Sequence, residues 1–150
     1  MAIRYLHLPA GSEPPAIGQD GPFKAVVLIE QDVDPDWQNR ISDWLVLSGC
    51  LYMMAWGRKA TEWDDSIDWA NLTLHDFESI PDDKSVMTTW HDDWPLAEVF
   101  FFAGNEAEHG TVELTDVWII DIHPADRRAL MLQQYAAAQE DDPAETLPAV

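Results

Sequence analysis

The stretch KAVVLIEQDVDPDW, residues 24–37, decides the fold class of this 150-residue chain. Its first half, Lys24–Glu30, is a continuous apolar run rich in Val, which is typical of a strand covered on both faces. Asp34 then precedes Pro35, the pair expected for an N-cap followed by the first helical position. Gly49 is placed to end that helix. A buried strand that leads directly into a helix predicts the first unit of an α/β fold.

The same alternation continues along the chain. Further strands are predicted at 51–56, 85–90 and 115–122, and further helices at 61–72, after Pro95 and after Pro124. The three consecutive Phe residues at 100–102 fit a helix or a strand equally well, and that choice stays open. Right-handed crossovers then give a three-layer sandwich around a small, largely parallel sheet of about four strands. The simplest strand order is the flavodoxin-like 2-1-3-4.

Composition divides the chain into three parts. Residues 1–22 hold four prolines and three glycines and predict an irregular segment, able to add an edge strand around Ile3–Leu8. Residues 23–139 form the single α/β domain. Residues 140–150 predict a flexible acidic tail.

Charge restricts the classes of partner. Eight basic against 28 acidic side chains give a formal charge of −20, which excludes nucleic acid and anionic membrane surfaces as direct partners. No apolar run reaches the roughly 18–20 residues of a membrane span, and no signal peptide is evident. The single cysteine, Cys50, excludes an internal disulfide and a cysteine-based zinc site. We expect a soluble, cytoplasmic domain.

Carboxylates and imidazoles follow the predicted strands, at the edge of the sheet where α/β proteins bind ligands. In a metal interpretation, Asp32, Asp92 and Asp121 hold Mg²⁺, and His91, beside Asp92, acts as a general base. Such a site also needs a cation for the phosphoryl group, and only Arg58 lies near that edge. In the alternative interpretation Asp34 and Asp93 cap helices, and the other acids at this edge hydrate the loops.

Other chemistries have less support. The five histidines show no HxH or HExxH spacing that would indicate zinc. The turn EQDVDPDW (30–37) contains no glycine, so a dinucleotide could not approach the backbone closely, and no cofactor is expected. Cys50 falls at a helix-to-strand junction and fits a small buried hydrophobe better than a nucleophile.

Tryptophans and acids occur together in the middle of the chain. Residues 60–126 carry 17 acids and one base, Lys84, and include WDDSIDW (63–69) and WHDDW (90–94). An indole flanked by carboxylates can bind a cationic group, although indoles also seal sheet ends and charge runs also serve solubility. The candidate binding residues are Trp56, Trp63, Asp64, Asp65, Asp68, Trp69, Trp90, His91, Asp92, Asp93 and Trp94.

The strings LYMMAWG (51–57), WDDSIDWANL (63–72), IPDD (80–83) and VMTTWHDDWPLAEVFFFA (86–103) resemble a family of small uncharacterised bacterial proteins. The resemblance covers roughly residues 24–122. It implies bacterial origin and an independent α/β domain, and it transfers no catalytic role to any residue.

Two hypotheses for function follow. The first is a non-enzymatic binding module, of the immunity or inhibitor type, whose acidic tryptophan-bearing face binds a basic protein. The second is a Mg²⁺-dependent enzyme or phosphoacceptor-like domain with its carboxylates at the strand ends. The pattern specifies neither the partner nor the oligomeric state.

Overall fold

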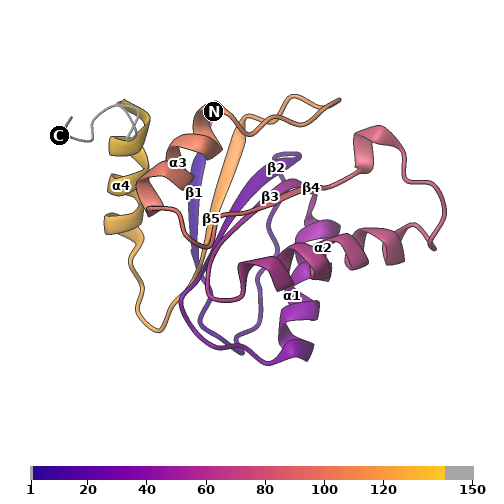
Figure 1. Cartoon of the computed structure of the whole chain (residues 1–150), viewed down its shortest axis with the longest axis horizontal. Helices are drawn as coiled ribbons and strands as arrows, with labels where there is room; N and C mark the ends of the chain where they lie inside the picture. The colour runs from indigo at the N-terminus through magenta and orange to yellow at the C-terminus, as the bar shows by residue number, and fades with distance from the viewer. Residues whose placement is uncertain (1, 141–150) are drawn as a thin grey trace.

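The computed structural model describes residues 2–140, which build a parallel sheet between two layers of helices (Figure 1). The strands are β1 (Ile3–His7), β2 (Phe23–Ile29), β3 (Cys50–Gly57), β4 (Met87–Trp90) and β5 (Asp116–Ile122). The helices are α1 (Pro35–Ser48), α2 (Ala60–Leu74), α3 (Leu96–Asn105) and α4 (Arg128–Glu140), with a short 3₁₀ turn, η1, at Asp82–Lys84. The predicted α/β class is confirmed.

The strand order differs from the prediction. The sheet runs β1-β5-β2-β3-β4 with every neighbouring pair parallel, so β5 lies beside β2, and β4 lies at an edge. The predicted order 2-1-3-4 placed β4 beside β2 and β5 at the edge. Its count of about four did not include β1, which forms where the N-terminal segment was predicted to be able to add an edge strand. Burial explains the correction: Ile119 and Ile120 in β5 are fully buried and need a neighbouring strand on each side. The shorter β4 has no fully buried residue and tolerates the edge.

Alternate residues of the buried strands supply two separate cores. In β2, Ala25, Val27 and Ile29 pack toward α1 and α2, whereas Val26 and Leu28 pack toward α3 and α4. Figure 1 shows the two helix pairs on opposite faces of the sheet. The sheet is therefore covered on both faces, as its run of apolar residues requires.

The helix boundaries follow from local chemistry. Asp34 caps α1 by accepting a hydrogen bond from the Asp36 N–H at 2.8 Å, and Gly49 ends the helix in the left-handed region, as predicted. The open choice at 100–102 is resolved as helix, in α3. Helix α2 begins at Ala60, one residue before the predicted start at 61, immediately after Lys59 turns the chain with φ 54°.

The N-terminal segment joins the sheet through β1, which pairs with β5. Residues 8–22 contain no helix or strand. Of the acidic tail predicted for 140–150, only Glu140 belongs to the described residues, as the last residue of α4, and the rest lies outside them. Within residues 2–140, the model contains no helix with the length and apolar character needed to cross a bilayer.

Gly57 fits the end of β3 against the end of β2. Its φ is +107°, and a Cβ at this position would collide with the carbonyl oxygen of Ile29. The next residue, Arg58, donates its N–H to that same carbonyl at 2.8 Å. Only glycine combines the left-handed backbone with so close an approach.

Replacing Gly57 should therefore destabilise the fold. We expect Gly57→Ala to lower the free energy of unfolding by about 2 kcal/mol or more, because backbone strain and a collision add together. Urea denaturation measures the change. The control is Gly110→Ala, since a Cβ on Gly110 meets no heavy atom within 4 Å. Equal losses in the two variants would contradict this account of Gly57.

Candidate functional site

The candidate site lies where α2 runs along the edge strand β4. Helix α2 buries Trp63, Ile67 and Ala70 against the sheet. The neighbouring face of the helix, one residue further along the chain, carries Asp64, Asp68 and Asn71 at i, i+4 and i+7. Both Asn71 and Asp68 bond to the chain of β4 and the residues before it, so this stripe faces β4.

Asn71 sets the spacing between α2 and the start of β4. Its side chain is buried; Oδ1 accepts the Val86 N–H at 3.1 Å, and Nδ2 donates to the Lys84 carbonyl at 3.3 Å. These two bonds satisfy backbone groups that would otherwise lack partners at the entry to the strand. They hold the acidic stripe of the helix beside the strand.

Two residues of β4 face the same side of the sheet as α2. Thr88 pairs in register with Met53 and Trp90 with Ala55, and both partners belong to the core under α1 and α2. Trp90 is 50% exposed. We call Asp64, Asp68, Thr88 and Trp90 the acidic edge.

The two acids of α2 lie at the same heights along the sheet as the two residues of β4. The Thr88 hydroxyl donates to Asp68 Oδ1 at 3.5 Å. Helix α2 runs antiparallel to the strands, and one helical turn of about 5.4 Å nearly matches two strand residues at about 6.6 Å. Asp64 therefore stands at the level of Trp90, one turn away from Asp68.

The carboxylates of the acidic edge lack a cation. Burial raises the pKa of Asp68, and the neighbouring charges of Asp64 and Asp65 raise it further. One carboxylate oxygen of Asp64, Oδ1, is buried without a hydrogen-bond partner. Within residues 2–140, none of the ion pairs involves α2. Two like charges are thus held one helical turn apart without a cation among these residues, and one oxygen of Asp64 is removed from water.

The loop after β4 carries a second group of candidate residues, but it turns to the opposite face. The ring of His91 is buried and packs on Trp94 at 4.2 Å and on Phe102 of α3 at 5.0 Å. Trp56 Nε1 donates to the Trp94 carbonyl at 2.7 Å. Burial lowers the pKa of His91 to about 4, so the ring is a neutral packing group near neutral pH. The adjacent Asp92 and Asp93 are exposed.

The remaining candidates lie elsewhere on α2. Trp63 is fully buried in the core. Trp69 is 64% exposed and packs edge-on against Phe77 at 5.2 Å. Asp65 and Trp69 line a shallow pocket with residues of α1, on the side of α2 away from β4. The structure therefore divides the predicted set: Asp64, Asp68 and Trp90 lie at the acidic edge, and Trp56, His91 and Trp94 lie together on the opposite face.

The three carboxylates of the metal interpretation do not meet. Asp32 is exposed and pairs with Arg58 at 3.2 Å, Asp92 lies beyond the edge strand, and Asp121 is fully buried at the end of β5. In the order β5-β2-β3-β4, the ends of β5 and β4 are three strand spacings apart, about 14 Å. Within the described residues, no three His, Cys, Asp or Glu side chains are grouped to hold a metal ion.

Asp121 instead belongs to an ion-pair network at the ends of β1, β2 and β5. Arg127, just before α4, donates to both Asp121 oxygens at 2.6 and 3.0 Å and to Glu30 at 3.0 Å. The Tyr5 hydroxyl donates to Asp121 at 2.6 Å and accepts the Arg127 N–H at 2.9 Å. His123 Nε2 lies 3.6 Å from Glu30. The point where strand order reverses, which often binds ligands, is thus closed by the chain's own arginine.

Sequence reasoning missed Arg127 and Tyr5. Arg127 had one visible signal, since it is the first Lys or Arg after Lys84 and follows the strand that ends with Asp121. Tyr5 had none, because its contact depends on β1 lying beside β5.

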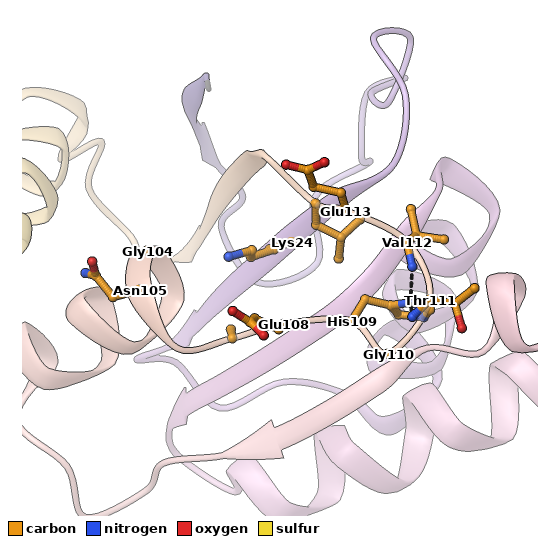
Figure 2. A pocket seen from close by; sticks show the side chains of 11 residues that line it. Lys24, Gly104, Asn105, Glu108, His109, Gly110, Thr111, Val112 and Glu113 are labelled. Atoms are coloured by element: carbon orange, nitrogen blue, oxygen red, sulfur yellow. Dashed lines mark hydrogen bonds between the residues drawn. The ribbon is translucent and has the colours of Figure 1, made fainter.

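A pocket of about 430 Å³ opens at the other end of the sheet, beside the loop after α3 (Figure 2). Lys24 Nζ donates to the Ala103 carbonyl at 2.7 Å, and burial lowers the pKa of this amine. His109 donates from Nε2 to the Ser85 carbonyl at 2.7 Å, while its Nδ1 accepts the N–H of Val112 at 3.0 Å. Both side chains therefore serve the structure: Lys24 compensates the carbonyl end of α3, and His109 shapes the loop.

The network around Asp121 should dominate the stability of this end of the sheet. We expect Arg127→Met to lower the free energy of unfolding by about 3–5 kcal/mol, because it leaves a buried carboxylate without its cation. Arg58→Met, which breaks the exposed pair with Asp32, should cost less than about 1 kcal/mol. Denaturant titration measures both, and similar losses would contradict the account.

His91 should make stability depend on pH. The folded state keeps the ring neutral down to about pH 4, whereas the unfolded chain binds a proton near the ordinary His pKa of about 6.5. Acidification through this window therefore favours unfolding. The His91→Phe variant keeps an aromatic ring but cannot titrate, so it should lose less stability between pH 6.5 and pH 4 than the wild type. Urea denaturation at several pH values measures the loss in each protein. Equal losses of stability between pH 6.5 and pH 4 would contradict the assignment to His91.

Comparison with known proteins yields one family. A search of curated proteins finds no match. The model of a domain of unknown function, DUF7684, matches residues 3–138, from the first residue of β1 into α4. The match includes every strand of the sheet and the whole acidic edge. The chain therefore belongs to the family of the domain of unknown function DUF7684.

Proposed function

We propose that the protein is a non-enzymatic binding module that engages a basic protein partner through the acidic edge. The observation that carries this proposal is the uncompensated pair Asp64 and Asp68. These carboxylates stand one helical turn apart and make no ion pair among residues 2–140. Asp64 is half-buried and its Oδ1 has no hydrogen-bond partner, whereas Asp68 is exposed. A cationic side chain supplied by a partner would relieve that repulsion.

The energetics favour a partner over a structural role. Like charges at i and i+4 destabilise a helix by about 0.2–0.5 kcal/mol, and burying a carboxylate oxygen without a bond adds to this. The fully buried carboxylate of Asp121, by comparison, is paired with Arg127. Acids kept at a cost to stability are typical of a binding surface.

The exposed ring of Trp90 adds a second means of holding a cation. An indole face attracts an ammonium or guanidinium group and contributes about 0.5–1 kcal/mol at an exposed site. Asp92 and Asp93 follow within three residues and are exposed. The 17 acids and one base of residues 60–126 extend the negative field over this half of the domain, which raises association rates with cations at low salt.

A bacterial immunity or inhibitor-type protein would be one instance of such a module. The alternative, a Mg²⁺-dependent enzyme using Asp32, Asp92, Asp121 and His91, has less support. Both oxygens of Asp121 are already engaged by Arg127, and the other two carboxylates lie apart from it.

For a module that binds through the acidic edge, we expect the partner to be a protein with clustered Lys or Arg.

Neutralising the acidic edge should weaken binding of a polycation more than an equal loss of charge elsewhere. We expect Asp64→Asn with Asp68→Asn to reduce the affinity for a short oligolysine about five-fold, taking about 0.5 kcal/mol for each carboxylate. The control pair is Asp43→Asn with Glu113→Gln, which removes two exposed charges from α1 and from the loop before β5. Calorimetry at low and physiological salt gives both affinities.

The two double variants carry the same net charge, so the comparison separates a site from a diffuse field. The control should change the affinity less than about two-fold at physiological salt, where distant charges are screened. If both variants weaken binding equally, the acidic edge is not the binding site and the proposal is wrong.

A further inference from the structure

Strand β4 leaves the backbone groups of Thr88 and Trp90 open on its outer edge. The His91 N–H donates to the Ala55 carbonyl at 2.8 Å, which continues the ladder between β3 and β4. In a parallel pair the bonded residues alternate, so Met87, Thr89 and His91 direct their backbone groups toward β3. Those of Thr88 and Trp90 point away from the sheet, and they have no hydrogen-bond partner in the part of the chain that is described.

The chain engages several backbone groups at other positions where an added strand could pair. Just before β4, the Ser85 carbonyl accepts a hydrogen bond from His109 and the Val86 N–H donates to Asn71. At the opposite edge, α4 packs along β1, and Arg128 donates to the outward Tyr5 carbonyl at 3.4 Å. On β4 this protection ends at Val86, which leaves Thr88 to Trp90 as the accessible segment of that strand.

The two faces beside this open segment have different chemistry. On the α2 face stand the carboxylates of Asp64 and Asp68 with the Trp90 ring. On the α3 face, Met87 is 44% exposed and lies in register with the buried Tyr52. Successive side chains of an added strand point to opposite faces. The surroundings therefore suit a strand in which basic and apolar residues alternate.

From this geometry we infer that β4 accepts an extended segment of the basic partner as a sixth strand of the sheet, with alternate Lys or Arg side chains directed at Asp64 and Asp68. This inference rests on the proposed function and gives its binding mode, in which main-chain bonds add affinity and side chains add specificity. A second copy of this chain is a poor occupant, because it would bring another pair of uncompensated acids and a further charge of −20 to the same edge.

The test uses two synthetic peptides of equal charge. The first alternates Arg and Val, and the second has the same sequence with N-methyl groups on alternate amides, which removes main-chain donors. The unmodified peptide should bind about ten-fold tighter, the effect of losing one or two main-chain hydrogen bonds. Equal affinities would overturn strand addition while leaving recognition of charge at the acidic edge intact.

A variant of the protein gives an independent measurement. Thr88→Pro removes an outward N–H that makes no bond to β3, a position where edge strands tolerate proline. It should weaken the Arg–Val peptide about ten-fold compared with Thr88→Val, which keeps the N–H. Thr88→Val is the matched control because both variants lose the hydroxyl that donates to Asp68.

The outcomes separate the two proposals. Unchanged Arg–Val peptide binding by a folded Thr88→Pro would refute strand addition. If that variant unfolds, which its thermal midpoint reports, the comparison of methylated and unmodified peptides still decides the question. Failure of the Asp64 and Asp68 variants to weaken oligolysine refutes the proposed function itself.

Discussion

The burial of β2 on both faces and along both sides determines the rest of the architecture. All seven residues of this strand are buried, so it needs a neighbouring strand on each side and helices above and below. The chain provides β3 directly after α1 and then places β4 beyond β3. It must return beneath the other face, through α3, to place β5 against the free side of β2. This return makes β4 an edge strand.

Acidic side chains are paired with a cation at one end of the sheet and unpaired beside its edge strand. At the ends of β2 and β5, Arg127 compensates Asp121 and Glu30, and the point of reversal is filled by the protein itself. At the open edge, Asp64 and Asp68 have no cation among the described residues. The excess of negative charge is thus neutralised where it supports the fold and left unsatisfied beside β4. A binding role for that edge accounts for the difference.

Much of the fold could be predicted because it depends on local chemistry. The apolar run of β2, the Asp34 cap, Pro35 and the Gly49 terminator each act within a few residues and define a strand and a helix correctly. The strand order was wrong, although the residues contained the information. The centre of the segment that forms β5, residues 117–120, is apolar throughout, whereas the segment that forms β4 contains Thr88 and Thr89, which suits an edge.

The sequence predicted which kinds of residue form the candidate site, but not which of them lie together. Clustering of tryptophans and acids in the sequence does not by itself separate the buried Trp63 from the exposed Trp69; their six-residue spacing on one helix does. Only the packing of α2 along β4 brings Asp64 and Asp68 beside Trp90. Pairing of Asp121 with Arg127 also depends on tertiary structure, since it needs β5 and the start of α4 to meet over Tyr5.

Amide hydrogen exchange at β4 tests most directly whether its outer edge is open and receives a cationic strand. The account predicts that Thr88 and Trp90 exchange quickly in the free protein while Thr89 and His91 are protected by β3. Adding the alternating Arg–Val peptide should then slow Thr88 and Trp90 selectively. Protection of all four amides in the free protein, or no slowing when the peptide is bound, would contradict the account.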